Sequence, residues 1–286
     1  MPESIISRGI SILANEGPVV LANKIIQLTK NKIYSKVYKT SKDPKYWMYR
    51  IKGERKLCIN NQCVVSDISN MGVYRETEFI CRNEVEILED MMSEAKSGDI
   101  FLDIGANIGI HALFVEKIVD ETVAIEPHPV NDSVFLTNKE KNDSNIDVYA
   151  CAFSDSSGYL KLLGPRGGGQ VDGSASLSSI SNYTEKPNGI FVRVENGDEF
   201  IVKEKISDPT IVKIDVEGAE ENVINGLTKT IQKPQCRVLY CEIHEDRSDY
   251  ESIVSKLKSF GYTIEIIQER KPDKVIKAKK PDQLET

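Results

Sequence analysis

The chain has 286 residues, of which 40% are hydrophobic and 28% are charged, as in an ordinary globular protein. This length suffices for one large domain with an extension, or for two small domains. The sequence contains no apolar run of about 18 residues, and its N-terminus lacks the apolar core of a secretory signal. We therefore expect a cytoplasmic protein without a membrane-spanning helix.

Charge is unevenly distributed along the chain. Residues 1–50 hold nine lysines and arginines against three acids, whereas the remaining residues hold 28 against 41. The acidic body argues against nucleic acid as the main partner. In the basic leader, residues 18–38 predict an amphipathic helix that packs on the rest of the chain or on a second subunit of a homodimer. The alternative is weak attachment to an anionic membrane or to a lipid-linked substrate.

The six cysteines include no CxxC pair and show no zinc-ligand spacing. We expect reduced thiols and no metal site. Cys58 and Cys63 would pair across a hairpin only if the geometry of the chain brings them together.

The first expected elements precede the central part of the chain. Residues 46–81 are typical of β-structure, with a turn at residues 52–54, and residues 76–92 predict a helix with one apolar side. We place a basic extension at 1–70, a main domain at 71–278 and a polar, frayed tail at 279–286.

A strand, a glycine turn and a helix follow. Residues 100–104 form the apolar run of a strand buried on both faces of a parallel sheet. Residues 105–109 are a tight turn with two glycines, and apolar residues then recur at helical spacing. This order predicts the opening of a nucleotide-binding βαβ unit, whose turn brings backbone N–H groups close to a ligand.

A second strand, residues 122–126, ends in an acid followed by Pro127. Glu126 lies 21 positions after Gly105, about where nucleotide-binding folds place the carboxylate that accepts from both ribose hydroxyls. Residues 130–141 predict a helix and residues 146–153 a third strand, followed by a hairpin with residues 159–163. The Gly/Ser-rich stretch 164–188 predicts a mobile lid or, alternatively, a surface insertion.

Further strands are expected at residues 191–194, 210–215, 237–243, 262–267 and 274–277, with helices at 219–231 and 250–260. This alternation predicts a doubly wound α/β fold with a mostly parallel, seven-stranded sheet and an antiparallel edge hairpin. Ligands bind such sheets outside the carboxyl ends of the strands. Polar residues gather at these ends: Asp103, Glu126, Asp215, Glu242 and His244.

The turn is not a dinucleotide fingerprint, because Asn107 and Ile110 occupy two of the three glycine positions. No Walker A loop occurs either. An acid two residues before the first glycine would repel pyrophosphate, but it would attract a cation such as the ammonium group of S-adenosylmethionine.

At this point the chain resembles the FkbM family of S-adenosylmethionine-dependent methyltransferases, which have the Rossmann-like class I fold. The resemblance covers about residues 75–270. It rests on Asp103-Ile-Gly-Ala-Asn-Ile-Gly109, Glu126-Pro-His-Pro129 with Asn131 and Asn138, Lys213-Ile-Asp-Val-Glu-Gly-Ala-Glu220, and Glu242-Ile-His244. The family's Leu-Asp-Asp segment is replaced by residues 195–199, in which Asp198 is the closest equivalent.

The resemblance implies a cofactor site. Gly105, Ala106 and Gly109 would line the methionine part, Asp103 would bind the amino group and Glu126 the ribose, while Cys151 or Ala152 would lie near the adenine. The residues that we expect to bind S-adenosylmethionine are Asp103, Gly105, Ala106, Asn107, Gly109, Glu126, Pro127, Cys151, Ala152 and Asp215.

Methylation of a hydroxyl requires a base that removes the proton. His244 is the first candidate, because imidazole titrates near neutral pH. The expected catalytic residues are His244, Asp215, Glu242 and Glu217. Glu220 and His111 are alternative bases, although Glu220 would also suit a helix N-terminus and His111 a backbone contact. These acids would also suit a divalent cation, a possibility that their spacing does not decide.

Two functions therefore stand. The first is O-methylation of a hydroxyl on a sugar, glycan or secondary metabolite, an acceptor class that the resemblance supplies. The second is a non-catalytic, Rossmann-like partner protein that binds a nucleoside.

Overall fold

The computed structural model describes residues 51–68, 71–163, 176–177 and 189–281. The chain divides into two units, Met1–Ile51 and Lys52–Thr286, so the division differs from the boundary expected after residue 70. The amphipathic helix expected in the basic leader, residues 46–50 of the expected β-structure and most of the Gly/Ser-rich stretch lie outside the described residues. Among the described helices, none combines the length and apolar character needed to cross a membrane.

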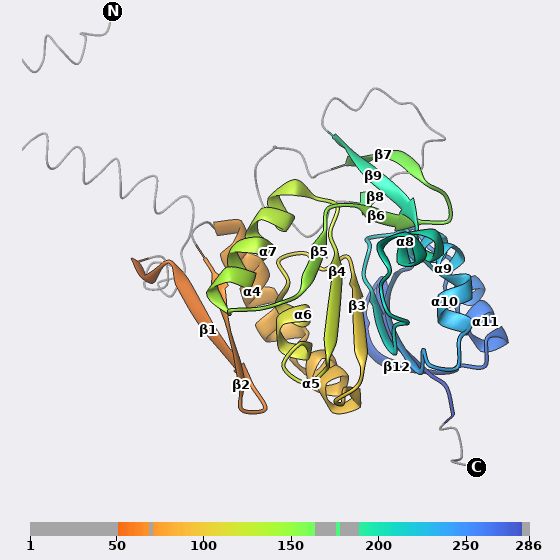
Figure 1. Ribbon diagram of the computed structural model, residues 1–286, viewed down its shortest axis with the longest axis horizontal. Helices are drawn as coiled ribbons and strands as arrows, with labels where there is room; N and C mark the ends of the chain where they lie inside the picture. Colours follow the sequence, from red (N-terminus) through yellow and green to blue (C-terminus); the bar gives the residue numbers. More distant parts are fainter. Residues whose placement is uncertain (1–50, 69–70, 164–175, 178–188, 282–286) are drawn as a thin grey trace, which may run out of the picture. The chain divides into compact units, whose positions relative to one another are not determined.

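A seven-stranded sheet forms the centre of the second unit (Figure 1). Its order is β12-β13-β11-β10-β3-β4-β5, and β13 runs antiparallel to both β11 and β12. The expected doubly wound fold with an antiparallel edge hairpin is thus confirmed. The strands are β3 (Ile100–Ile104), β4 (Glu121–Ile125), β5 (Asp147–Tyr149), β10 (Ile211–Ile214), β11 (Val238–His244), β12 (Thr263–Arg270) and β13 (Asp273–Lys279).

Helices cover both faces of this sheet (Figure 1). One face carries α4 (Met71–Asn83), α5 (Val85–Glu94), α6 (Ile110–Val115) and α7 (Pro129–Lys141). The other carries α8 (Gly197–Glu204), α9 (Glu220–Gly226), α10 (Thr228–Gln232) and α11 (Tyr250–Ser259). Alternate residues of β3 enter different cores: Phe101 packs with the first set of helices and Leu102 with the second.

A second sheet lies beside the first and has the order β6-β9-β7-β8. Its strands are β6 (Ala152–Ser154), β7 (Gly158–Leu163), β8 (Ser176–Leu177) and β9 (Ile190–Asn196). The single strand expected at 146–153 is therefore wrong, because the chain leaves the main sheet after Tyr149 and enters the second at Ala152. The expected hairpin of this strand with residues 159–163 is also wrong, since β9 lies between β6 and β7.

Two predicted helices are each divided in two. The helix expected at 76–92 is interrupted at Glu84, whose backbone is not helical (φ −121°, ψ 3°) and whose carboxylate lies 3.4 Å from Arg270. The helix expected at 219–231 is interrupted at Leu227, just after Gly226 packs against the backbone of β6. Lys279 belongs to β13 rather than to a frayed tail.

A β-hairpin of β1 (Glu54–Ile59) and β2 (Gln62–Asp67) precedes α4. Asn60 and Asn61 have positive φ, which makes a tight turn and places Cys58 opposite Cys63. These two cysteines form a disulfide, so the expectation of reduced thiols is wrong for this pair. The four other cysteines are free thiols.

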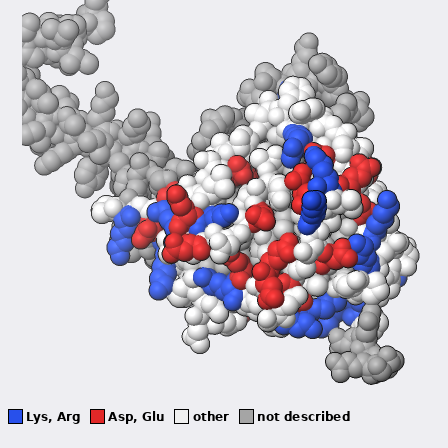
Figure 2. Space-filling view, viewed as in Figure 1, with Lys and Arg blue, Asp and Glu red and all other residues white. Residues whose placement is uncertain are grey.

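Acidic and basic side chains are mixed over the face of the molecule seen in Figure 2, rather than separated into patches of one sign. The acidic residues lie mainly across the middle of this face. A continuous basic surface, which nucleic-acid binding requires, is not visible among the described residues on this side.

Candidate active site

A cavity of about 450 Å³ lies at the carboxyl ends of β3, β4, β10 and β11. Its wall includes the turns after β3 and β4 on one side and the residues after β10 and β11 on the other. This is the edge at which parallel α/β sheets bind ligands. Of the predicted site residues, Gly105, Asn107, Glu126, Pro127, Ala152, Asp215, Glu217, Glu242 and His244 line the cavity.

Gly105 is the point of closest backbone approach in the cavity wall. Its φ is +78°, and a Cβ at this position would lie 1.8 Å from the carbonyl oxygen of Asp215. Only glycine satisfies both conditions. The strand end of β3 can therefore lie directly against that of β10, with the cavity above them.

Gly109 and Ala106 have a packing role instead. Gly109 has a φ of +82° and precedes α6, and a Cβ there would lie 2.2 Å from the ring of Phe135. The structure places neither Gly109 nor the buried Ala106 in the cavity wall. The expected contact of these two residues with the cofactor stays a prediction.

Glu126 fastens the turns after β3 and β4 together. One carboxylate oxygen accepts from the backbone N–H of Asn107 and the other from that of His128, each at 2.8 Å. The Asn131 amide donates to it at 3.4 Å. Burial raises the pKa of Glu126 to about 7, against the effect of these hydrogen bonds.

Two amide oxygens beside Glu126 have no partner. Oδ1 of Asn107 and Oδ1 of Asn131 are both buried, and neither accepts a hydrogen bond. Both residues line the cavity. Because buried polar atoms are almost always hydrogen-bonded, these oxygens indicate a ligand that brings donors, such as hydroxyl or ammonium groups. The residues present therefore fit the ribose and amino groups of S-adenosylmethionine.

Asp103 does not reach the cavity wall. It is fully buried, and its carboxylate lies 3.4 Å from Nζ of Lys213. Burial raises the pKa of Asp103 and the charge of Lys213 opposes this rise. Cys151 is also fully buried and outside the wall, whereas its neighbour Ala152 lines the cavity. The structure thus places Ala152, but not Asp103 or Cys151, in the cavity wall.

Lys213 links β3, the strand before the glycine turn, to Asp215 at the end of β10. Its ammonium lies between Asp103 and Asp215, at 3.4 and 3.2 Å. Burial would lower the pKa of Lys213, but the surrounding carboxylates outweigh it and raise the pKa. Lys213 in turn holds the pKa of Asp215 below its ordinary value, although burial acts in the other direction. Asp215 is therefore an ionised carboxylate.

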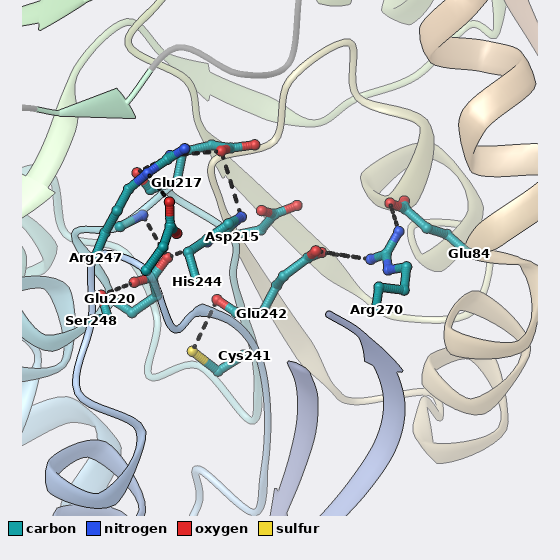
Figure 3. A network of polar contacts seen from close by, with 12 residues as sticks. Glu84, Asp215, Glu217, Glu220, Cys241, Glu242, His244, Arg247, Ser248 and Arg270 are labelled. Carbon is teal, nitrogen blue, oxygen red and sulfur yellow. Dashed lines mark hydrogen bonds and ion pairs between the residues drawn. The ribbon is translucent and has the colours of Figure 1, made fainter. Parts of the chain in front are cut away.

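His244, at the end of β11, lies among carboxylates (Figure 3). Its Nδ1 is 2.7 Å from Oε1 of Glu220, and its Nε2 is 3.5 Å from Oε2 of Glu217. Burial lowers the pKa of His244, but the Glu220 hydrogen bond and the charges of Asp215 and Glu217 outweigh it and raise the pKa to about 9.

Glu217 stands on a strained turn beside His244. It has a φ of +56° and is followed by Gly218 with a φ of +101°, where a Cβ would meet the side chain of Arg247. Arg247 bonds both the backbone carbonyl and the carboxylate of Glu217, at 3.1 and 3.2 Å. Strain of this kind is stored where the surrounding structure holds it, often at functional sites.

The arginine on the far side of His244 is also paired. Arg270 donates to both oxygens of Glu242 at 2.9 Å and lies 3.4 Å from Glu84 (Figure 3). Burial and the charge of Asp215 raise the pKa of Glu242, while Arg270 opposes this. Glu242 therefore stands in the wall as a partner of Arg270.

Two groups of these side chains have donor atoms of the kind that bind metal ions. Asp215, Glu217 and His244 place one possible ligand atom each within 4.8 Å of one another, as do Glu242, His244 and Asp273. Four of the five residues already have protein partners, as described above. The expectation that none of them is a metal ligand stays a prediction.

Two other candidates lie away from the cavity. His111 is buried next to Glu84, and burial lowers its pKa to about 3, so it is a neutral imidazole outside the main cavity wall. Asp198 accepts hydrogen bonds from Thr230 and the backbone of Lys229, and so caps α10. Neither residue is placed to act on a ligand.

The sequence analysis missed several residues of the cavity wall. His128 and Asn131 were quoted in the Glu126 motif without a role, and their signal was their position in the turn after a buried strand. Phe79, Phe153 and Leu162 also line the cavity. They come from α4 and the second sheet, whose placement over the site no local pattern indicates.

The fold and the cavity together define a Rossmann-like class I methyltransferase fold. A model of the methyltransferase FkbM domain matches residues 103–264. The chain belongs to this family and is a methyltransferase.

The chain is similar to two methyltransferases and to one solved structure. The chain is 23% identical over 177 residues to the hexuronic acid methyltransferase AglP of Haloferax volcanii, which covers 62% of this chain and 70% of that protein. It is 26% identical over 199 residues to the 31-O-demethyl-FK506 methyltransferase FkbM of Streptomyces tacrolimicus, with 60% and 75% covered. A crystal structure of the methyltransferase FkbM from Methylobacillus flagellatus gives a TM-score of 0.46 at 18% identity, with 72% and 53% covered.

Proposed function

We propose that this protein transfers a methyl group from S-adenosylmethionine to a hydroxyl of a sugar, a glycan or a secondary metabolite. The observation that carries the proposal is that two kinds of group line one cavity. The first is Gly105 and Glu126 with two unpartnered amide oxygens, and the second is His244 among carboxylates. The first suits a nucleoside with an amino-acid tail, and the second suits removal of a proton.

The cavity is acidic, and this supports a cationic cofactor. Among the described residues that line it, carboxylates outnumber basic side chains, and the one arginine, Arg247, is paired with Glu217. S-adenosylmethionine carries a sulfonium and an ammonium, so opposite charges favour its binding. At Gly105 the protein backbone would lie close to the cofactor. Glu126 would accept hydrogen bonds from the ribose hydroxyls, and Asn107 and Asn131 would accept them from the cofactor's remaining donors. Pro127 and Ala152 would lie against its base.

S-adenosylmethionine supplies a methyl group on a good leaving group when it is bound. His244 would take the proton from the acceptor hydroxyl as the new C–O bond forms. Asp215, Glu217 and Glu242 would orient the acceptor, because alignment supplies much of the rate of such a transfer. The products are a methyl ether and S-adenosylhomocysteine.

The names of the relatives support the acceptor class. One acts on a hexuronic acid and the other restores a methyl group on an oxygen. Hydroxyl methylation on a sugar or metabolite is therefore the reaction that we propose for this chain. Action in the cytoplasm, formation of a homodimer and a membrane contact through the basic leader remain proposals of the same kind.

The test is a mass-spectrometric screen with S-adenosylmethionine that carries an isotopically labelled methyl group. Hydroxylated sugars, glycans and metabolites are offered, and the expected result is one labelled methyl on an oxygen of at least one acceptor. The His244→Ala variant should lose this activity by about 100-fold or more. If His244→Ala retains full turnover, the base assignment is wrong.

We do not propose the alternative of a non-catalytic partner protein that binds a nucleoside, because the chain belongs to a family of methyltransferases.

A further inference from the structure

We propose that Glu220 is the positioning residue of His244: its buried carboxylate holds the imidazole so that Nδ1 points inward and Nε2 faces the cavity. This inference rests on the proposed function for its catalytic consequence. The contact itself can be tested without any methyl acceptor.

Glu220 has no contact with the cavity and cannot act on a substrate directly. It is the first residue of α9, is fully buried and is absent from the cavity wall. Its Oε1 accepts from His244 Nδ1 at 2.7 Å and from the backbone N–H of Gly218 at 2.8 Å, while Oε2 accepts from the hydroxyl of Ser248 (Figure 3). All its interactions therefore serve to hold His244 and the turn beside it.

A general preference of acids for helix N-termini does not explain this burial. Glu221, the next residue, also lies in the first turn of α9 and would serve the helix dipole. Burying a carboxylate completely is costly unless hydrogen bonds and charges compensate it. The hydrogen bonds from His244, Gly218 and Ser248 supply this compensation. Because His244 is one of the donors, the buried carboxylate is stabilised only when the imidazole has this orientation.

The hydrogen bond also selects the tautomer. An ionised carboxylate only accepts, so the proton must sit on Nδ1 of His244. The other nitrogen, Nε2, is then the basic atom of the neutral ring. It lies 3.5 Å from Glu217, too far for a strong hydrogen bond, and remains available to an acceptor hydroxyl.

The charged groups around His244 come from several elements. Asp215 and Glu217 face it from the turn after β10, and Glu220 from α9. Glu242 lies on β11, the strand that also carries His244. Asp273 of β13 lies opposite His244 in the strand pair, and Arg247 lies in the loop after β11. The carboxylates favour the protonated ring. A cationic cofactor acts in the opposite direction and favours the neutral, basic ring.

Glu220→Gln is the conservative variant. A glutamine keeps an oxygen that can accept from both His244 and Gly218, and its amide can donate to Ser248 in place of the reverse bond. The tautomer and the orientation should be retained, while the negative charge is lost. Glu220→Ala loses both. Glu221→Gln is the matched control, since Glu221 accepts from the Ser252 hydroxyl at 2.7 Å and does not touch His244.

The first measurement is imidazole ¹⁵N NMR of the full chain, titrated from about pH 5 to about pH 10. The chain has three histidines, so His111→Asn, His128→Asn and His244→Asn variants assign every signal. We expect the His244 signal to titrate highest and to show an Nδ1–H tautomer when neutral. Glu220→Gln should keep this tautomer with a lower pKa, and Glu220→Ala should give a mixture of tautomers. If both variants match the wild type, the proposal is overturned.

The second measurement is the pH profile of kcat in the labelled-methyl assay. Glu220→Ala should lower kcat by about 10- to 100-fold, the usual effect of removing a partner that orients a functional histidine. Glu220→Gln should retain more activity and shift the acidic limb to lower pH. A purely structural role would lower activity without moving this limb, and that result would contradict the proposal.

Binding of S-adenosylhomocysteine distinguishes failure of the proposed function from failure of the Glu220 proposal. It should be unchanged within about twofold in all Glu220 variants, since the residue does not touch the cavity. If the NMR results hold but the wild type binds no S-adenosyl ligand, the proposed function fails and the Glu220 contact stands. If binding and turnover are observed but the His244 signal is the same in the wild type and the Glu220 variants, the proposed function stands and the Glu220 proposal fails.

Discussion

At the scale of single residues, Glu126 shows how one carboxylate both builds and uses the site. Its oxygens accept from the backbone N–H groups of Asn107 and His128, so it holds two turns together at the cavity. Oε1 accepts from both His128 and Asn131, whereas Oε2 accepts only from Asn107 and keeps a lone pair that could accept from a ribose hydroxyl. The same group thus shapes the wall and, in the function that we propose, would bind the cofactor.

Replacement of Glu126 by alanine should weaken S-adenosylmethionine binding by at least about tenfold, because the ribose hydroxyls and two backbone N–H groups lose their acceptor. Isothermal titration calorimetry measures this change. Glu140→Ala, an exposed position on α7, is the control and should bind as the wild type does. An unchanged affinity in Glu126→Ala would refute the placement of the ribose.

Lys213 is a buried charge whose partners would be left uncompensated by its removal. Lys213→Met keeps the volume of the stem but leaves Asp103 and Asp215 without their cation. The free energy of unfolding should fall by about 3 to 5 kcal/mol, as measured by urea denaturation. Lys229→Met, on the short helix α10, serves as the surface control. A loss below about 1 kcal/mol would show that Lys213 is not the main compensation for these acids.

The residues that the sequence predicted well are those next to buried strands. Gly105, Glu126, Asp215 and His244 follow apolar runs, and parallel strands bring their ends to one edge. The prediction for Asp103 is less accurate, because the motif gives its position in the sequence but not the direction in which its side chain points. A strand alternates its side chains, and the structure turns Asp103 toward Lys213, away from the cavity wall.

At the scale of elements, the β1–β2 hairpin is held on α7 by two asparagines. Asn142 accepts from the backbone N–H of Val65 and donates to its carbonyl, both at 2.8 Å. Asn138 accepts from the N–H of Asp67 and also donates to the carbonyl of Ile108, which lies in the glycine turn. The edge of β2 is therefore covered by side chains, and the hairpin is connected to the glycine turn.

Asn142→Ala should lower the free energy of unfolding by about 1 to 3 kcal/mol, because Val65 loses the partner of both its backbone groups. Hydrogen exchange of the Val65 amide should also accelerate. Asn145→Ala, an exposed residue after the same helix, is the matched control. Equal stability of the two variants would mean that Asn142 does not anchor the hairpin.

Elements were predicted less well where tertiary contacts override local pattern. The helix expected at 76–92 is interrupted at Glu84, whose side chain contacts Arg270, a residue 186 positions away in the sequence. The third strand changes sheets after Tyr149, and no residue in its apolar run signals this change. Periodicity reports which faces are buried, but it does not report which sheet buries them.

At the scale of the whole molecule, the charges of the cavity couple stability to pH. The pKa of His244 in the folded chain, about 9, lies above its ordinary value of 6.5. Its contribution to stability is therefore complete below about pH 6.5 and is lost as the pH rises through 9. This contribution is of the order of 3 kcal/mol.

Denaturation in urea across this range should thus show a falling free energy of unfolding from about pH 6.5 to about pH 9. His244→Asn should reduce this slope. His128→Asn keeps a side chain that can cap α7 and should leave the slope unchanged. If His244→Asn has the slope of the wild type, the carboxylates around the imidazole do not hold it protonated.

The acidic cavity also makes a prediction for the cofactor as a whole. The sulfonium of S-adenosylmethionine contributes a charge that S-adenosylhomocysteine lacks, and unscreened carboxylates favour the charged ligand. The most direct test is calorimetric titration of the full chain with S-adenosylmethionine. We expect one site with a dissociation constant in the micromolar range, which corresponds to a binding free energy of about −8 kcal/mol or a few kcal/mol weaker. Binding should be weaker in Glu126→Ala. Absence of binding at millimolar S-adenosylmethionine would contradict the proposed cofactor site.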